Sequence, residues 1–186
     1  MGDLIYAGRS VNKKLLVSLS AIGAQQAAAT EETAGEIEQL LDYVATYPND
    51  GILFQNSYMI LVAHAEAGVL NESKSRRRAG THILLSENEP KQKLNGPVLT
   101  IGQIMKNVMA SAAESEISAL FDTGKKMIPL RNTLIEMGWP QPQTPIQTDN
   151  STAVGVTKKT IANKDTKSAD MKIWWIRDME SQEQFR

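Results

Sequence analysis

The order of apolar and polar segments after residue 57 limits this chain to a mixed α/β fold. The segment SYMILVAHAEAGVL is an apolar strand that ends near Glu66, and THILLSE is a second strand after the basic connection ESKSRRRAG. The segment KLNGPVLTIG supplies a turn at Asn95 and Gly96, followed by a third strand. Three successive strands joined in this way predict an antiparallel meander over about residues 57–102.

A long helix and a short fourth strand follow the meander. The segment SAAESEISALFDTGKKMIPLRNTLIEMG is typical of a helix capped by Ser111, and Pro129 inside it should kink or divide it. The apolar side of this helix consists of Ile117, Leu120, Phe121 and Ile128. The connector WPQPQTP leads to a strand at 145–149 that turns directly into another helix. We therefore expect an α/β arrangement in which the fourth strand is parallel to the first.

The first 48 residues have a different character, with no alternating strand pattern. Leu- and Ala-rich stretches predict helices, and Thr30 is a candidate N-cap with Glu31 and Glu32 in the first turn. The expected apolar face of that helix consists of Ile37, Leu40, Leu41 and Val44. We predict a helical segment over residues 1–56 and a separate α/β domain over residues 57–186.

Composition restricts the classes of function. The 186 residues are 41% hydrophobic, enough for a core, and 20 Lys and Arg against 21 Asp and Glu give no global attraction to nucleic acid or lipid. The absence of cysteine excludes disulfides and thiolate metal sites. No charged leader and no apolar run of about 20 residues is present, so a cytoplasmic or nuclear location is expected.

Acidic residues occupy the positions where such sheets form their sites. Glu66 ends the first strand, Asp149 ends the fourth, and Glu114 and Glu116 begin the helix between the third and fourth strands. Parallel strands present their C-terminal ends at one edge, and carboxylates gathered there repel one another unless cations neutralise them. Mg²⁺ takes oxygen ligands of this kind, and paired ions can clamp the oxygens of a phosphodiester. The pattern suggests metal-dependent phosphodiester cleavage.

A simpler interpretation stands beside this one. Asp149 can cap the helix that follows it, and spacing alone favours that role. Glu114 and Glu116 can be solvated first-turn acids stabilised by the helix dipole.

Three short motifs favour the metal-binding interpretation of these acids over the capping one. The strings ASAAESEISAL, TPIQTDNSTAVGV and ADMKIWWIRD, in this order after a strand-end acid, resemble the ribonuclease H domain of copia-type retrotransposon polyproteins. Residues 1 to about 56 are similar to the tail of the reverse transcriptase that precedes that domain. The resemblance implies a ribonuclease H-like mixed sheet and hydrolysis of the RNA strand of RNA–DNA hybrids. It also implies two Mg²⁺ (or Mn²⁺) ions held by four carboxylates.

The resemblance transfers three of the four acids to this chain. Glu116 and Asp149 match the helix acid and the acid of the TDNSTAVG motif, whereas Glu66 stands where the family has the shorter Asp. The fourth acid follows a fifth strand in the family, and we expect both to be missing here, which leaves the sheet edge unpaired. Asp170 is expected to be a structural or surface acid. The implied catalytic and metal-ligating set is Glu66, Glu116 and Asp149, with impaired activity.

Two other functions remain open. The chain can be a catalytically inactive transposon-derived fragment that binds nucleic acid or a protein partner, or, ranked last, a structural domain unrelated to nucleic acid. The run SKSRRRAG can contact phosphates but is more typical of a solvated turn. Lysines after the fourth strand could line a nucleic-acid path: Lys158, Lys159, Lys164, Lys167 and Lys172. His64 and His82 are interpreted as ordinary strand residues, and Trp174 and Trp175 as packing residues of a helix.

Overall fold

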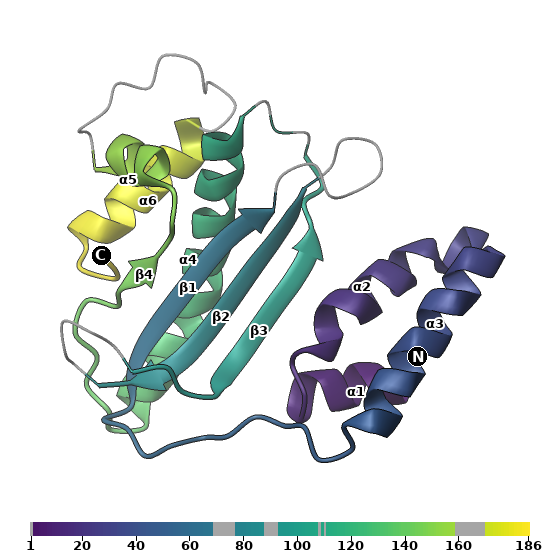
Figure 1. Ribbon diagram of the computed structural model, residues 1–186. Coiled ribbons are helices and arrows are strands. Elements are labelled where there is room, and N and C mark those ends of the chain that lie inside the picture. Colours follow the sequence, from purple (N-terminus) through teal and green to yellow (C-terminus); the bar gives the residue numbers. More distant parts are fainter. Residues whose placement is uncertain (1, 69–76, 88–92, 108, 110, 159–169) are drawn as a thin grey trace. The chain divides into compact units, whose positions relative to one another are not determined.

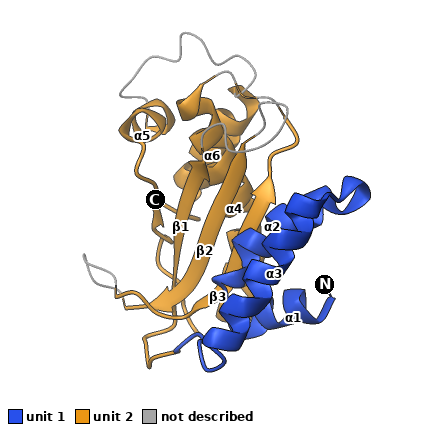
Figure 2. Ribbon diagram, turned by 45° about the vertical axis from the view of Figure 1, so that its right-hand side comes forward, with its two compact units in different colours: residues 1–53 blue, residues 54–186 orange. Residues whose placement is uncertain are grey.

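The computed structural model describes residues 2–68, 77–87, 93–107, 109, 111–158 and 170–186. The chain divides into two compact units, Met1–Leu53 and Phe54–Arg186, shown in blue and orange in Figure 2. Each unit is described by itself. No helix among the described residues is long and apolar enough to cross a bilayer.

The first unit is helical, as the sequence predicted. It contains α1 (Gly2–Ser10), α2 (Leu15–Gln25), a 3₁₀ turn η1 (Gln26–Ala28) and α3 (Glu31–Thr46). The Thr30 hydroxyl accepts a hydrogen bond from the Thr33 amide (3.3 Å), which confirms the predicted cap of α3. Only part of the predicted apolar face is buried, because Leu40 packs against α2 whereas Ile37 and Leu41 are exposed.

The second unit is built on a mixed four-stranded sheet (Figure 1). Its strands β1 (Ile60–Gly68), β2 (Arg78–Ser86), β3 (Pro97–Ile104) and β4 (Ile146–Gln147) lie in the order β3-β2-β1-β4. The β1–β2 and β2–β3 pairs are antiparallel, and β4 runs parallel to β1. The predicted meander and the parallel fourth strand are therefore confirmed.

Three helices among the described residues complete this unit. The helix α4 (Ala112–Glu136) crosses behind the sheet in Figure 1, and α5 (Ser151–Thr157) and α6 (Asp170–Ser181) contact it. The core lies between one face of the sheet and these helices and includes Leu61, Ile83, Ile117, Met127 and Ile173. The fold class implied by the resemblance, a ribonuclease H-like mixed sheet with flanking helices, is confirmed by this arrangement.

Two local predictions for α4 have different outcomes. The Ser111 hydroxyl accepts a hydrogen bond from the Glu114 amide (3.1 Å), so the predicted cap is confirmed. Pro129 does not divide the helix, which continues from Ala112 to Glu136. Pro129 lies on the exposed side of α4, where a carbonyl that lacks an amide partner can bond to water instead.

The prediction that the sheet edge beside β4 is unpaired is wrong. The Arg186 amide donates to the Thr144 carbonyl (2.9 Å), and the Ile146 amide donates to the Arg186 carbonyl (2.9 Å). A parallel bridge joins Thr144 to Phe185, whose buried ring contacts Trp175 of α6. Residues 184–186 thus pair in parallel with residues 144–146 through an isolated bridge.

Candidate active site

The central feature of the candidate site is a buried carboxylate between two strand ends. The pairing of β4 with β1 joins Ala63 to Ile146 and His64 to Gln147. Beyond it, the Ala67 amide of β1 donates to Glu116 Oε1 (2.9 Å), and the Thr148 hydroxyl donates to Glu116 Oε2 (3.2 Å). Glu116 therefore ties the C-terminal end of β1 to the segment that follows β4, at the crevice where open α/β sheets place their sites.

The environment of Glu116 opposes its ionisation. The residue is 5% exposed, and burial is the main cause that raises its pKa above the ordinary value. The hydrogen bonds from Ala67 and Thr148 lower this pKa, whereas the nearby charges of Asp149 and Glu66 raise it further. The three acids named from the sequence are thus close enough to influence one another electrostatically.

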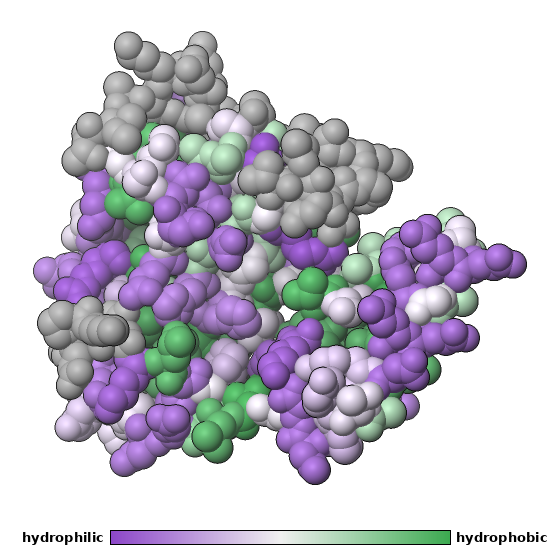
Figure 3. All heavy atoms as spheres, in the orientation of Figure 1, coloured by the Kyte–Doolittle hydropathy of each residue, from purple (hydrophilic) through white to green (hydrophobic). Residues whose placement is uncertain are grey.

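Glu66 and Asp149 lie on the open side of this arrangement. Both are exposed and line one cavity of about 360 Å³, together with His64, His82, Gln147 and Thr148. Hydrophilic residues are interspersed with hydrophobic ones on the visible face of the second unit (Figure 3). The volume of the cavity is sufficient for a small polar ligand, to which Glu66 and Asp149 present two carboxylates.

The capping interpretation of Asp149 is wrong. The N-cap of α5 is Asn150, whose side-chain oxygen accepts a hydrogen bond from the Ala153 amide (2.9 Å). Because Asn150 takes the capping position, the carboxylate of Asp149 is left for another role. The solvated interpretation of Glu114 and Glu116 is also wrong, since both side chains are buried.

The acids do not form a ready metal site in this conformation. Within the described ranges, no group of three or more His, Cys, Asp or Glu side chains is arranged to hold a metal ion. Glu116 uses both oxygens in hydrogen bonds, and it does not line the cavity that Glu66 and Asp149 share. The assignment of these three acids as metal ligands therefore stays a prediction.

The cavity also contains a histidine pair whose relationship the sequence did not reveal. His64 of β1 lies directly opposite His82 of β2, and His82 Nδ1 is 3.1 Å from Thr100 Oγ1 of β3. Burial lowers the pKa of His64, and its Nε2 atom is shielded from solvent without a hydrogen-bond partner. An unsatisfied buried nitrogen costs about 1–3 kcal/mol. Alternation within each strand does not reveal this pair, because both the shared face and the pairing depend on the register of β1 against β2.

A buried arginine fixes the segment that leads to β4. Arg131 of α4 donates from Nη1 to the Pro142 carbonyl and to Thr144 Oγ1 (3.1 Å), and from Nη2 to the Gln141 carbonyl (2.7 Å). The Gln141 side chain in turn accepts from the Leu61 amide of β1 (2.9 Å). These contacts set the position of β4 against β1, and hence the position from which Asp149 projects.

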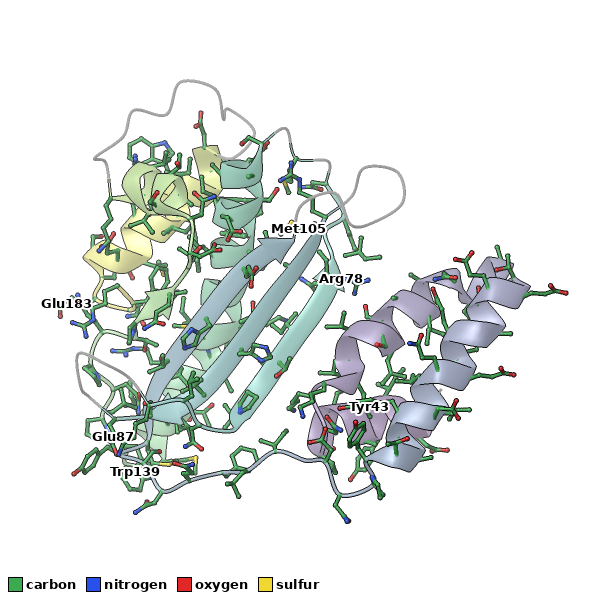
Figure 4. The ribbon with its side chains drawn as sticks, in the orientation of Figure 1. Tyr43, Arg78, Glu87, Met105, Trp139 and Glu183 are labelled. Carbon is green, nitrogen blue, oxygen red and sulfur yellow. The ribbon has the colours of Figure 1, made fainter. Side chains whose placement is uncertain are left out.

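The described residues include only part of the basic run and of the lysine set, and Arg77 does not fit the solvated turn that was expected for the run. Arg77 is buried and Arg78 begins β2, near Met105 at the end of the sheet where β1 ends (Figure 4). Lys158 lies 4.0 Å from Glu180, and Lys172 donates to Ser118 Oγ (2.7 Å). The remaining members of the two sets fall outside the described residues: Lys74, Arg76, Lys159, Lys164 and Lys167.

Two further predictions concern α6. Trp175 packs edge-on against Phe121 with ring centroids 5.0 Å apart, as predicted for a packing residue, whereas Trp174 is exposed with Arg177 over its ring. Asp170 begins this helix, is half-buried and does not line the cavity that contains Asp149.

Solved structures with some similarity to this chain include several ribonucleases H. LC11-RNase H1 from a compost metagenome has a TM-score of 0.49 and 11% identity, covering 67% of this chain and 77% of that one. The ribonuclease H domain of prototype foamy virus has a TM-score of 0.39 and 16% identity, covering 66% and 72%. These scores are low, so the fold assignment rests on the strand order and pairing described above.

Sequence comparison identifies a relative among transposon proteins. No protein-family model matches the chain. The chain is 23% identical over 186 residues to the retrovirus-related Pol polyprotein from transposon TNT 1-94 of Nicotiana tabacum. The match covers 100% of this chain but only 14% of that polyprotein. The chain is thus similar along its whole length to a segment of a retrovirus-related Pol polyprotein.

Proposed function

We propose that this chain is a ribonuclease H-like domain of a retrotransposon reverse transcriptase, of the copia type, preceded by the tail of that enzyme. Its substrate would be the RNA strand of an RNA–DNA hybrid. The observation that supports this proposal best is Glu116, which joins the ends of β1 and β4 beside the two exposed acids Glu66 and Asp149. The TNT 1-94 similarity supports the origin in a polyprotein.

The carboxylates of Glu66, Glu116 and Asp149 are chemically suited to a hard divalent cation, but Glu116 is not positioned to bind one in this conformation. Carboxylate oxygens are the ligands that Mg²⁺ and Mn²⁺ prefer, and Glu66 and Asp149 present theirs to one cavity. Glu116 would have to exchange a hydrogen bond from Ala67 or Thr148 for a metal contact. We therefore expect Glu66 and Asp149 to provide the first contacts with the ion and Glu116 to complete the set.

The protein residues contribute positioning and charge. A divalent cation bound at such carboxylates stabilises the attacking and leaving oxygens of a phosphodiester. Glu116, held by Ala67 and Thr148, fixes the spacing between the two strand ends, and Asp149 and Glu66 concentrate negative charge at the mouth of the cavity. Because Glu66 is one methylene longer than the family Asp, its carboxylate is displaced, and an error of about 1 Å can lower the rate on the order of a hundredfold.

A second candidate function is an inactive transposon-derived fragment that binds nucleic acid or a protein partner. The full engagement of Glu116 in protein hydrogen bonds favours it, as does the lack of a three-acid metal group among the described residues. Both candidates predict weak or no cleavage by the unmodified chain, so they must be separated by a variant that restores the site.

The test measures hydrolysis of a labelled RNA–DNA hybrid with Mg²⁺ or Mn²⁺ by the wild type, Glu66→Asp and Glu66→Asp combined with Glu116→Gln. We expect slow cleavage by the wild type, an increase of about tenfold or more in Glu66→Asp, and loss of that increase in the double variant. No cleavage by Glu66→Asp would favour the inactive fragment. Robust cleavage by the wild type would show that another acid completes the site, and Asp170 is the first to replace.

Metal binding provides a readout that does not depend on turnover. Mn²⁺ relaxation should show binding to the wild type and weaker binding to Asp149→Asn. The control Asp42→Asn removes an exposed carboxylate from α3 in the other unit. Equal Mn²⁺ binding by the wild type and Asp149→Asn would remove Asp149 from the ligand set.

A further inference from the structure

The histidine pair occupies the face of the sheet that does not contact α4. Ala63, Ala65 and Ile83 pack in the core on the α4 side, so the alternation of the strands places His64 and His82 on the opposite face. The two residues are Cα partners in an antiparallel ladder, in which Cβ atoms lie about 4.5–5.5 Å apart. Two imidazoles at this separation can reach a common atom placed between them.

Both rings have features of metal-ligating histidines. His64 lines the cavity, and its Nε2 atom has no hydrogen-bond partner, so a bound cation would satisfy a nitrogen that the protein leaves unsatisfied. The contact between His82 Nδ1 and Thr100 Oγ1 (3.1 Å) can hold that ring in the tautomer with its proton on Nδ1. A second ring nitrogen held by an oxygen is the usual support of a histidine that binds metal through the other.

We propose that His64 and His82 form a binding site for a divalent cation of borderline softness, of the Zn²⁺, Co²⁺ or Ni²⁺ class. Imidazole nitrogen suits these ions, whereas Mg²⁺ prefers oxygen ligands. The site is distinct in chemistry from the carboxylate set of the proposed nuclease, although the two share one cavity. Among the described residues, no group of three ligating side chains is preformed, so the two histidines alone do not complete the coordination of the ion. Water or the oxygens of Glu66 and Gln147, which line the same cavity, supply the remaining positions.

The sequence allows an unusually clean test of this proposal. The chain contains only two histidines and no cysteine, so an untagged double variant offers neither imidazole nor thiolate to a metal. The full untagged chain, His64→Ala, His82→Ala and the double variant are titrated with Zn²⁺ by calorimetry and with Co²⁺ by visible absorption. Circular dichroism and the urea midpoint establish that each variant is folded.

We expect one Zn²⁺ per wild-type chain and a loss of affinity of about tenfold or more in each single variant. Thr100→Val, which removes only the contact to His82 Nδ1, should weaken binding less than His82→Ala does. Absence of saturable Zn²⁺ binding, or equal affinity in the wild type and the double variant, would overturn the proposal. Zn²⁺ binding that survives both histidine substitutions but disappears in Asp149→Asn would overturn it too, by placing the ion at the carboxylates. Failure of the Mn²⁺ and cleavage experiments would leave this result unaffected.

Discussion

Replacement of Arg131 by methionine tests whether the buried arginine of α4 sets the position of β4. Methionine keeps most of the aliphatic volume but removes the donors that bond to the carbonyls of Gln141 and Pro142 and to Thr144 Oγ1. Thr144 is fully buried and Gln141 nearly so. These acceptors therefore lose their partner at a place where water cannot readily replace it.

The expected cost follows from these contacts. A hydrogen bond to a charged group contributes about 1.5–3 kcal/mol, so three of them give a gross loss of roughly 4.5–9 kcal/mol. Burial disfavours the charged form of Arg131 and lowers its pKa, so removal of the buried charge offsets part of the loss. We expect a net destabilisation of about 3–5 kcal/mol, equivalent to a fall of roughly 10–20 °C in Tm.

Urea unfolding followed by tryptophan fluorescence measures this difference. The control Lys126→Met makes a similar change at an exposed position of the same helix and should alter stability by less than about 0.5 kcal/mol. If Arg131→Met lowered the free energy of unfolding by less than about 1 kcal/mol, the acceptors would have found other partners. The proposed role of Arg131 as the anchor of β4 would then be refuted.

Two further predictions concern buried polar groups. Because the folded-state pKa of Glu116 is raised above its ordinary value, the unfolded state releases this proton at a lower pH than the folded state does, and the wild type loses stability as pH rises between these two pKa values. In the presence of a chelator, Glu116→Gln should lack this loss, so its free energy of unfolding relative to the wild type should rise from mildly acidic to neutral pH in urea titrations. A difference between the two proteins that does not change with pH would contradict the raised pKa of Glu116. The buried hydroxyls of Thr81 and Thr123 lie 2.7 Å apart and link β2 to α4. Each single Thr→Val variant should lose about 1–3 kcal/mol and the double variant much less, whereas additive losses in a double-mutant cycle would show that the hydroxyls do not depend on each other.

The local predictions that succeeded depend on short stretches of sequence. Strand alternation and the Ser111 cap are determined by neighbouring residues, and the sequence contained them. The parallel direction of β4 also followed, because the long helix α4 returns the chain to the end at which β1 begins. These features together determined the fold class.

The predictions that failed depend on contacts between distant segments. The burial of Glu116 results from Ala67 and Thr148, which lie 49 and 32 residues away along the chain. Spacing within one helix cannot show which strand ends will meet it. The pairing of His64 with His82 likewise needs the register, since a slip of one residue would place the two rings on opposite faces.

The short parallel run of residues 184–186 beside β4 has a practical consequence for probes and affinity tags. Arg186 lines a cavity with Thr148, and Thr148 also lines the cavity that contains Glu66 and Asp149. A fluorophore attached to the carboxyl group of Arg186 would therefore lie close to the candidate site and could report on ligands entering it. A polyhistidine tag at that position would bring competing imidazoles to the same place, so purification tags belong at the other terminus and should be removable.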